Sequence, residues 1–246
     1  MGTLRRVSAV WICLPTYNEA ENLERMVRAL GAERDEHALD LTVLVVDDGS
    51  PDGTGDIADR LAQELPWVRV LHRTSKDGLG RAYLAAFRVA LDGGADLVME
   101  MDCDFSHDPK DVLRLVAAAD DADLVVGSRN VPGGGVKGWP WYRNVISKGG
   151  SFYARTILRM PIRDMTAGFK LFRRKVLETL DLSGIEASGY MFQIELKYRT
   201  VQAGFRVREV PVTFVDREFG ESKMTGSIVT EAMWRVWKLR FRRQQR

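Results

Sequence analysis

The sequence predicts an α/β protein whose mostly parallel sheet is flanked by helices. Short apolar segments alternate with amphipathic ones through residues 7–128, which is the pattern of strands joined by right-handed helical crossovers. Polar and acidic clusters follow three of the apolar segments, and a parallel sheet brings the carboxyl ends of its strands to one edge. Loop composition alone does not explain that convergence, so we expect a ligand site at this edge.

Five short apolar runs have the length and composition of buried strands. They cover residues 7–14, 41–46, 68–72, 97–101 and 124–127. Pro15 is expected to end the first strand and Asn18 to cap the next helix, in which apolar residues recur at helical spacing until Gly31 closes it. Amphipathic spacing predicts three further helices in this half, at residues 56–65, 81–91 and 109–119.

The second half of the chain is expected to contain more helix than strand. Gly133–Gly135 predicts a mobile loop. A short strand is expected after Lys170, and the alternation over 205–215 predicts one further strand. Apolar faces at helical spacing predict three helices, at residues 139–159, 190–202 and 227–243.

Composition limits the class of protein. The chain has 246 residues, of which 45% are hydrophobic, enough for one large α/β domain. Its 36 Lys and Arg nearly balance 34 Asp and Glu, so general nucleic-acid binding is not expected. Two cysteines provide no disulfide framework and suit a reducing compartment. We find neither a signal peptide nor an apolar run long enough to span a membrane, and we expect a cytoplasmic protein.

The C-terminal segment differs from the rest. We expect a catalytic domain over residues 1–226 and a basic amphipathic helix or tail over 227–246. The last 13 residues contain six basic residues and no acidic one, with Trp234, Trp237 and Phe241 along one side. Aromatic residues flanked by basic ones suit a helix that lies on an anionic membrane surface. The alternative is an ordinary helix that docks its Trp side on the core.

The fourth apolar run stops at two aspartates, Asp102 and Asp104. Residues i and i+2 of an extended segment point the same way, so both carboxylates can aim at one point. A divalent cation would relieve their repulsion, and Mg²⁺ or Mn²⁺ binds such oxygen ligands, commonly together with substrate phosphates. The alternative is a strand end followed by a helix cap at Asp108-Pro109. His107 is expected to be a polar loop residue, and the alternative is that it supports the paired aspartates from behind.

Polar residues after the first two strands suit a nucleotide. Asp47 and Asp48 end the second strand, where a carboxylate can accept hydrogen bonds from ribose hydroxyls or a base N–H. Tyr17 offers a flat face for a base, and Glu19 an acceptor beside it. The composition of residues 48–53 also favours a tight turn. A P-loop, a dinucleotide fingerprint and a zinc pattern are missing from the sequence.

Six motifs occur in order along the chain: Leu14–Glu19, Val46–Thr54, Lys76–Gly80, Asp102–Pro109, Gly127–Arg129 and Asp164–Lys170. With residues 217–223, they resemble the polyprenol-phosphate (dolichol-phosphate) mannose synthases, inverting family 2 glycosyltransferases with the Rossmann-like GT-A fold. The resemblance implies mannose transfer from GDP-mannose to a polyprenyl phosphate, giving polyprenyl-phosphate β-mannose, a lipid-linked mannose donor. The alternatives are glucose transfer from UDP-glucose to the same lipid, and a nucleotide-sugar-binding module without catalysis.

The resemblance also implies roles for individual residues. The guanosine pocket would be lined by Pro15, Tyr17, Glu19, Val46 and Asp48, and the ribose and diphosphate would be touched by Asp102 and Cys103. Asp104 would be the principal metal ligand and Ser106 the second, where some relatives carry Gln. Phosphates of donor or acceptor would be contacted by Arg129, Arg217 and Lys223, and the acceptor phosphate would lie near Arg143 and Ser147. The catalytic set would be Asp104, Arg129, Arg143 and Arg217.

The chemistry of the acceptor defines what such a site must do. A lipid monophosphate is already anionic near neutral pH, so no strong general base is needed. The difficulty is the approach of two anionic groups, which a metal ion and arginines would ease, and one displacement would invert the anomeric centre. The implied partners are GDP-mannose, a polyprenyl phosphate and the cytoplasmic face of the membrane, with a separate membrane anchor protein as a further candidate and no nucleic acid.

Overall fold

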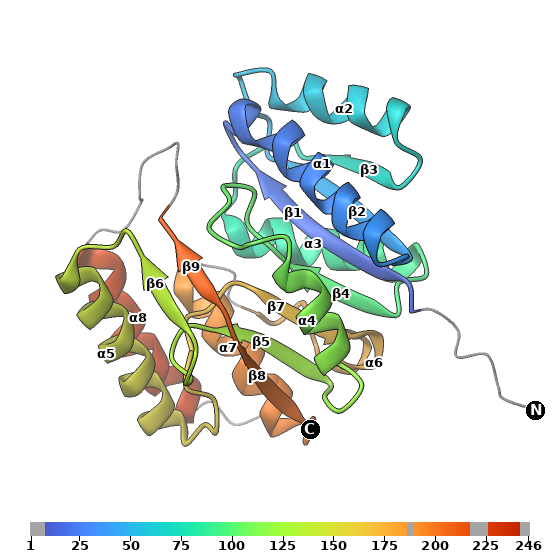
Figure 1. Ribbon diagram of the computed structural model, residues 1–246. Helices are drawn as coiled ribbons and strands as arrows, with labels where there is room; N and C mark the ends of the chain where they lie inside the picture. The colour runs from blue at the N-terminus through green and yellow to red at the C-terminus, as the bar shows by residue number, and fades with distance from the viewer. Residues whose placement is uncertain (1–7, 186–188, 217–225, 242–246) are drawn as a thin grey trace, which may run out of the picture.

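The structure is a computed structural model that describes residues 8–185, 189–216 and 226–241. Within these residues, seven strands form one sheet in the order β3-β2-β1-β4-β7-β5-β8, and β6 pairs with β9 (Figure 1). The strands are β1 (Val10–Thr16), β2 (Leu41–Asp47), β3 (Val68–His72), β4 (Leu97–Glu100), β5 (Leu124–Ser128), β6 (Gly135–Lys137), β7 (Lys170–Arg173), β8 (Val207–Pro211) and β9 (Thr213–Val215). The helices are α1 (Ala20–Glu36), α2 (Thr54–Glu64), α3 (Leu79–Asp92), α4 (Asp111–Ala118), α5 (Trp141–Leu158), α6 (Arg174–Thr179), α7 (Gly189–Gln202) and α8 (Gly226–Phe241).

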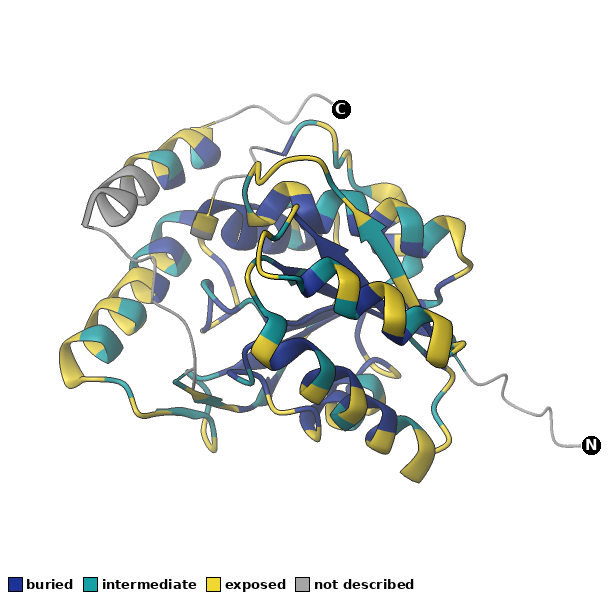
Figure 2. Cartoon of the chain, turned by 90° about the horizontal axis from the view of Figure 1, so that it is seen from above, coloured by how far each residue is buried: buried dark blue, intermediate teal, exposed yellow. Residues whose placement is uncertain are grey.

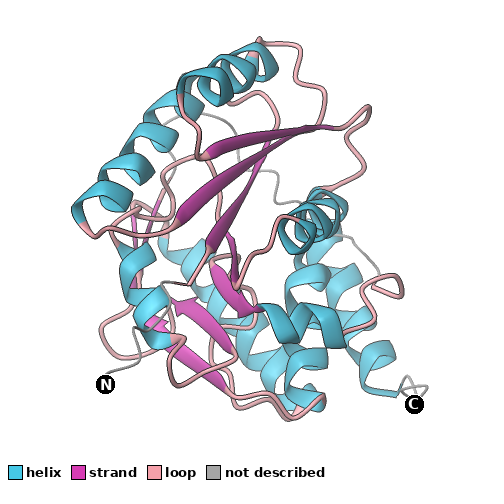
Figure 3. Cartoon of the chain, turned by 90° about the vertical axis from the view of Figure 1, so that its right-hand side faces the viewer, coloured by secondary structure: helices cyan, strands magenta, loops and turns pink. Residues whose placement is uncertain are grey.

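Helices cover both faces of the large sheet. Figure 3 shows the strands between helical layers, and Figure 2 shows burial concentrated between these layers. In β1, Val10, Ile12 and Leu14 pack on the side of α1 and α4, whereas Trp11 and Cys13 pack on the side of α3 and α7. The alternation follows from the two-residue period of an extended chain. Burial on both faces explains why the parallel strands are continuous apolar runs.

Strand β7 lies between β4 and β5 and runs antiparallel to both, an arrangement that the sequence did not predict. Its first residue, Lys170, pairs with Glu100 at the end of β4 and with Val126 in β5. The segment before β7 therefore reaches the same edge as the carboxyl ends of the parallel strands. Residues 164–169 join this edge because β7 runs in the reverse direction.

A buried ion pair sits at this pairing position. Glu100 and Lys170 are both fully buried, and Oε1 of Glu100 lies 3.0 Å from Nζ of Lys170. Gln193 on α7 donates its Nε2 to the other carboxylate oxygen of Glu100, at 3.0 Å. Buried charges of this kind require a partner, and here each carboxylate oxygen has one.

Two predicted strands differ from the structure. Pro15 does not end β1, which continues to Thr16. β4 pairs with β1 only as far as Cys13. A backbone N–H at position 15 would therefore have no strand carbonyl to bond on that side, and proline costs the sheet no hydrogen bond there. The predicted single strand over 205–215 is in fact β8 and β9, which belong to different sheets. β6 and α6 were not predicted.

Helix α1 differs from its prediction at both ends. Asn18 is not its cap; it has a left-handed φ of 59° and lies before the N-cap residue. The backbone N–H groups at the start of the helix are instead bound by the side chains of Thr54 and Asp52, at 2.9 and 3.1 Å. Gly31 does not close the helix. A Cβ there would lie 2.9 Å from the Trp67 ring, so glycine allows close packing inside α1.

Helix α8 packs against α5 and α7, at the end of the molecule away from β1–β3 (Figure 1). Among its described side chains, residues 234–241, Val236 and Leu239 are buried and pack on the core. Trp234, Trp237 and Phe241 are exposed, so the alternative in which α8 docks its Trp side on the core is wrong. None of the helices in the described part of the chain has both the length and the apolar composition needed to cross a bilayer.

Candidate active site

The loop after β4 contains the predicted metal ligands. Asp104 is buried, and its Oδ1 accepts the backbone N–H of Ser106 at 3.0 Å. Phe105, between them, has a left-handed φ of 60°, an unfavourable conformation for a bulky residue that is found mainly at functional turns. The Ser106 hydroxyl oxygen is buried and has no hydrogen-bond partner among the described residues. A buried polar atom without a partner indicates a missing ligand or water.

This pair of oxygen donors fits a hard divalent cation. A carboxylate and a hydroxyl are ligands suited to Mg²⁺ or Mn²⁺, and the orphaned Ser106 oxygen would gain a partner. Within the described ranges, no group of three His, Cys, Asp or Glu residues could hold a metal ion. A cation bound by Asp104 and Ser106 would therefore complete its coordination with substrate phosphate oxygens and water.

Asp102 and His107 form the other side of this loop. Asp102 is partly exposed, and the hydroxyl of Tyr83 lies 3.5 Å from its Oδ1. His107 lies in this loop, as predicted, and it is buried and stacks on Phe169, with 4.8 Å between ring centroids. Its Nδ1 accepts the backbone N–H of Asp102 at 3.1 Å. Burial lowers the pKa of His107 to about 4, so the ring is neutral at pH 7 and holds the loop in place.

The ends of β1 and β2 lie side by side, as the nucleotide prediction requires. Asp48 is buried and bonded to Arg73, with 2.5 Å between Oδ1 and the guanidinium nitrogen. Burial raises the pKa of the Asp48 carboxyl, and Arg73 opposes that rise. Lys76 places its Nζ 3.4 Å from the centre of the Tyr17 ring. The aromatic face predicted for a base is therefore paired with a cation, which adds positive charge beside the nucleotide edge.

The remaining residues predicted to bind the nucleotide differ in how far they are exposed to solvent. Pro15 and Glu19 are partly exposed, and Oε2 of Glu19 accepts the side chain of Asn22 at 2.8 Å. Val46 and Cys103 are buried in the core, so their side chains do not line an open surface. Burial also raises the pKa of the Cys103 thiol, which keeps it protonated at neutral pH.

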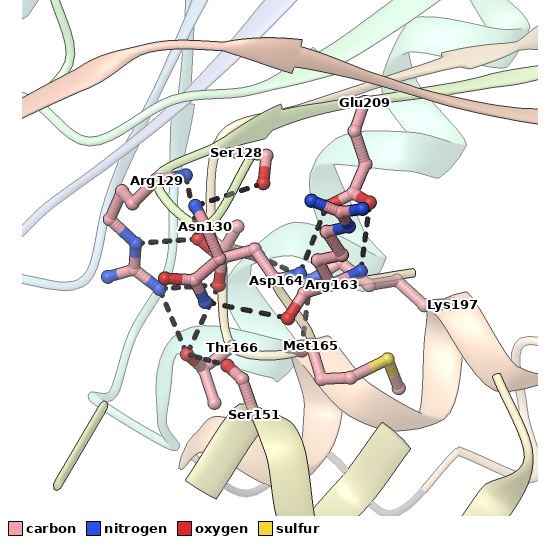
Figure 4. A network of polar contacts seen from close by, with 11 residues as sticks. Ser128, Arg129, Asn130, Ser151, Arg163, Asp164, Met165, Thr166, Lys197 and Glu209 are labelled. Carbon is pink, nitrogen blue, oxygen red and sulfur yellow. Dashed lines mark hydrogen bonds and ion pairs between the residues drawn. The ribbon is translucent and has the colours of Figure 1, made fainter. Parts of the chain in front are cut away.

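Arg129 follows β5 and is held by Asp164 (Figure 4). Its Nε and one terminal nitrogen donate to the two carboxylate oxygens, at 2.8 and 2.7 Å, and its backbone N–H donates to the same carboxylate at 2.9 Å. The terminal nitrogen also reaches Thr166 Oγ1 at 2.9 Å. Asp164 is fully buried. Burial raises the pKa of its carboxyl, but the opposite effect of Arg129 is larger, so the pKa lies below its usual value. The predicted phosphate contact of Arg129 stays a prediction.

Arg143, on the first turn of α5, lies beside Trp139. Its guanidinium carbon is 4.1 Å from the centre of the Trp139 ring, and it pairs with Asp216 at 3.0 Å. The Nε of Arg143 and the Nε1 of Trp139 are both buried and lack hydrogen-bond partners among the described residues. Ser147 follows one turn later and is partly exposed. Donors without partners beside a cation are suited to an anion, as the acceptor-phosphate prediction requires.

Aromatic rings connect the acidic loop to the arginines. Phe214 on β9 meets His107 edge to face at 5.5 Å and Trp139 at 5.2 Å. Arg129 lies 5.6 Å from both the Phe214 and the Trp139 ring centres. The loop that contains Asp104 and Ser106 and the arginines Arg129 and Arg143 are thus neighbours. Arg217 and Lys223 lie outside the described residues, and their roles stay predictions.

The family model described as glycosyl transferase family 2 matches residues 11–181. The chain belongs to this family. Residues Leu14–Glu19, Asp47–Asp48, Asp102–Ser106 and Arg129 all lie within the matched region. The protein is thus a family 2 glycosyltransferase, as the resemblance implied.

Two curated relatives are similar over almost the whole chain. The polyprenol monophosphomannose synthase of Mycolicibacterium smegmatis is 50% identical over 98% of this chain and 91% of its own length. The undecaprenyl-phosphate mannosyltransferase of Micrococcus luteus is 52% identical over 91% of this chain and 90% of its own length. These relatives therefore include the regions that carry the site of this family 2 enzyme.

Solved structures share the fold. Glucosyl-3-phosphoglycerate synthase from Mycobacterium tuberculosis, in complex with Mn²⁺, UDP and phosphoglyceric acid, matches 94% of this chain and 77% of its own, with a TM-score of 0.67 and 18% identity. A mannosyltransferase from Pyrobaculum calidifontis, in complex with GDP-Man and Mn²⁺, matches 89% of this chain and 59% of its own, with a TM-score of 0.60 and 21% identity. The GT-A type of sheet predicted for this glycosyltransferase is confirmed.

Sequence reasoning missed several residues of the site. Arg73 follows β3, whose carboxyl end lies beside that of β2, and a basic residue after a parallel strand was the available signal. Lys76 began one of the six motifs but was given no role. Trp139 was assigned to a helix and Phe214 to a strand, and neither carries a sequence signal for contact with arginines. Asp164 was part of a motif, but its pairing with Arg129 joins residues 35 positions apart.

Removing the charge of Asp104 should abolish metal-dependent nucleotide binding. In Asp104→Asn, we expect GDP with Mn²⁺ to raise the melting temperature no more than GDP with EDTA does, because the carboxylate that would hold the cation is gone. Thermal shift measures the difference. Asp108→Asn, in the same loop, is the matched control, since the Asn side-chain oxygen can still accept the backbone N–H of Lys110. If GDP with Mn²⁺ raised the melting temperature of Asp104→Asn as much as that of the wild type, Asp104 would not be a metal ligand.

Replacing Arg129 should change the pH dependence of stability. In the wild type, the lowered pKa of Asp164 contributes stability that is lost as pH falls through that pKa. In Arg129→Met the buried carboxylate keeps the backbone N–H of residue 129 but loses its positively charged partner. We therefore expect the free energy of unfolding to fall by about 3–5 kcal/mol at pH 7, and by less at pH 5 because protonation relieves the charge. The free energy of unfolding, measured with urea at pH 7 and at pH 5 for both proteins, tests this prediction. Arg88→Met, on the exposed face of α3, is the control; an equal loss at both pH values would contradict the prediction.

Proposed function

We propose that this glycosyltransferase moves mannose from GDP-mannose to a polyprenyl phosphate and forms polyprenyl-phosphate β-mannose. The structural observation that carries the proposal is the contact between the acidic loop and the arginine pair through the aromatic rings of Phe214 and Trp139. A donor diphosphate suits the first half, and an anionic acceptor suits the second. The two relatives at 50% and 52% identity bear names of polyprenyl-phosphate mannose transfer, which supports the choice of sugar and lipid.

The residues of the chain would ease the meeting of two anions. A Mg²⁺ or Mn²⁺ ion held by Asp104 and Ser106 would neutralise charge on the leaving diphosphate. Arg129, fixed by Asp164, would place a positive charge between donor and acceptor, and Arg143 would bind the acceptor phosphate. The acceptor oxygen is already deprotonated, so no residue needs to act as a base. One displacement would invert the anomeric centre and give the β-linked product.

The exposed apolar side chains of α5 and α8 support a membrane role. These two neighbouring helices carry eight of the ten exposed large hydrophobic side chains in the described part of the chain: Trp141, Tyr142, Val145, Ile146, Phe152, Trp234, Trp237 and Phe241. Basic residues flank them, including Lys148 and Lys238. A surface of this size and charge suits an anionic membrane. The enzyme would then sit on the cytoplasmic face, where the lipid phosphate lies at the surface beside Arg143.

Nucleotide selectivity distinguishes mannose from glucose donors. We expect GDP with Mn²⁺ to raise the melting temperature and UDP to leave it almost unchanged, with about 2.7 kcal/mol of stabilisation at 100 times Kd. Labelled GDP-mannose and a polyprenyl phosphate should then give an organic-extractable product whose NMR spectrum has the β-configuration. Selectivity for UDP, with transfer of glucose, would contradict the proposal and favour UDP-glucose as the donor.

Membrane binding should depend on the aromatic side chains of α5 and α8. We expect the wild type to sediment with anionic vesicles and a variant carrying Trp141→Ser, Phe152→Ser, Trp234→Ser and Trp237→Ser to bind at least about tenfold more weakly, because apolar burial and basic attraction act together. Leu79→Ser, an exposed apolar position on α3, is the control. Equal sedimentation of the variant and the wild type would exclude this surface.

A further inference from the structure

Trp139 contacts both of the arginines that the proposed reaction needs. The centre of its ring is 4.1 Å from the guanidinium carbon of Arg143 and 5.6 Å from that of Arg129. Both distances fall within the range of about 6 Å over which the face of an aromatic ring attracts a cation. The two guanidinium groups repel each other, whereas the ring attracts each of them. One indole therefore offsets part of the repulsion between the two cations.

The two cations are largely removed from water, which strengthens their attraction to the ring. The exposed fraction of the side chain is 9% for Arg129 and 17% for Arg143. Each guanidinium group also has a carboxylate partner, Asp164 at 2.7 Å from Arg129 and Asp216 at 3.0 Å from Arg143. These carboxylates hold the arginines one by one, and Trp139 contacts both, so the ring relates the position of one guanidinium group to that of the other.

The pairing of β6 with β9 fixes the position of this ring. The ring of Trp139 meets the ring of Phe214 on β9 edge to face, with 5.2 Å between centroids. Gly138, between β6 and Trp139, has a left-handed φ of 87°, a turn conformation that favours glycine. The backbone N–H of Val215 on β9 donates to the carbonyl oxygen of Ser106 at 3.2 Å. The indole is thus held by the same strand that contacts the predicted metal loop.

We propose that Trp139 is a positioning residue that holds the guanidinium groups of Arg129 and Arg143 close together in the free enzyme, so that the acceptor phosphate meets a preformed pair of cations. This inference rests on the proposed function and adds a residue that sets the affinity for the acceptor. With a weaker ring, repulsion separates the two cations in part of the molecules. The apparent affinity for the phosphate then falls with the fraction in which they remain close.

Fluorine on the indole ring tests this attraction with little change in the shape of the side chain. Each fluorine withdraws electron density from the face of the ring and weakens its attraction for a cation. With one, two or three fluorines on the tryptophan at position 139 alone, we expect the KM for a water-soluble, short-chain polyprenyl phosphate to rise at each step, by about 5- to 30-fold in total. The kcat at saturating acceptor should change by less than about twofold, because the bound phosphate itself then holds the arginines.

Trp67 offers a matched control. The guanidinium carbon of Arg34 lies 5.7 Å from the centre of its ring, and Trp67 precedes β3, at the opposite end of the parallel strands from the site. Fluorine at position 67 should lower the free energy of unfolding, as fluorine at position 139 should, but leave the KM for the acceptor unchanged. In Arg143→Gln, which removes one of the two cations beside Trp139, the fluorine series at position 139 should raise the KM by a smaller factor.

The direction of the change in KM decides between roles for Trp139. A KM that stays constant across the series at position 139 would show that the ring only fills space, and the inference would fail. A KM that falls at each step would also overturn it, because fluorine makes the indole N–H a stronger donor, and the result would indicate a hydrogen bond to the phosphate instead.

The free energy of unfolding, measured without substrate, separates this inference from the proposed function. If it falls at each step for position 139 but no polyprenyl phosphate is accepted, the proposed function fails while the ring is still shown to hold the cations. If it does not change for position 139 but falls for position 67, the inference fails whatever the substrate. If the donor is UDP-glucose, the same series is measured with that donor, and the expected rise in KM for the lipid phosphate is unchanged.

Discussion

The ion pair between Arg129 and Asp164 joins the parts of the chain that make up the site. Arg129 follows β5, Asp164 precedes the antiparallel strand β7, and both are held by contacts from other elements. Backbone N–H groups of Arg163 and Asp164 donate to Glu209 on β8, at 2.8 and 2.9 Å. Thr166 connects the pair to Ser151 on α5, with 3.3 Å between hydroxyl oxygens (Figure 4). Because a buried pair is not in itself a large source of stability, its main effect here is positional.

The reversed strand β7 is the topological reason that this pairing is possible. A parallel strand in the same place would have put residues 164–169 at the opposite edge of the sheet, away from Asp102 and Asp104. Antiparallel pairing of Glu100 with Lys170 brings both motifs to one edge. Helix α7 then supports them from the core through Gln193 and Lys197. The loop after β4 and residues 164–169 are thus held at one edge by one strand direction and one helix.

Much of the parallel half followed from the sequence because local rules decide it. The apolar runs, the crossovers and the acidic residues after β2 and β4 depend on period and length alone, and the structure places them as predicted. The errors arose where tertiary contacts decide. Gly31 was assigned to a helix end because glycine commonly stands there, but the Trp67 ring requires it inside α1. His107 lies in a loop, as predicted, but its burial against Phe169 depends on a contact between distant segments that no local pattern indicates.

The acceptor half was predicted by resemblance rather than by residue pattern. No periodicity indicates that Trp139 contacts both Arg129 and Arg143, because these contacts depend on how α5 packs beyond the sheet. Likewise, the central place of β7 cannot be derived from its four residues, since strand order depends on the connections between strands. Val46 shows a further limit: a residue in a matching motif can be wholly buried in the core.

Anomalous diffraction from crystals grown with GDP and Mn²⁺ tests most directly whether this edge of the sheet binds the donor. A manganese peak is expected within about 2.0–2.4 Å of the Asp104 carboxylate, with the diphosphate on the side of Arg129 and Trp139. A manganese peak elsewhere, or a nucleotide bound away from the ends of β1, β2 and β4, would contradict it.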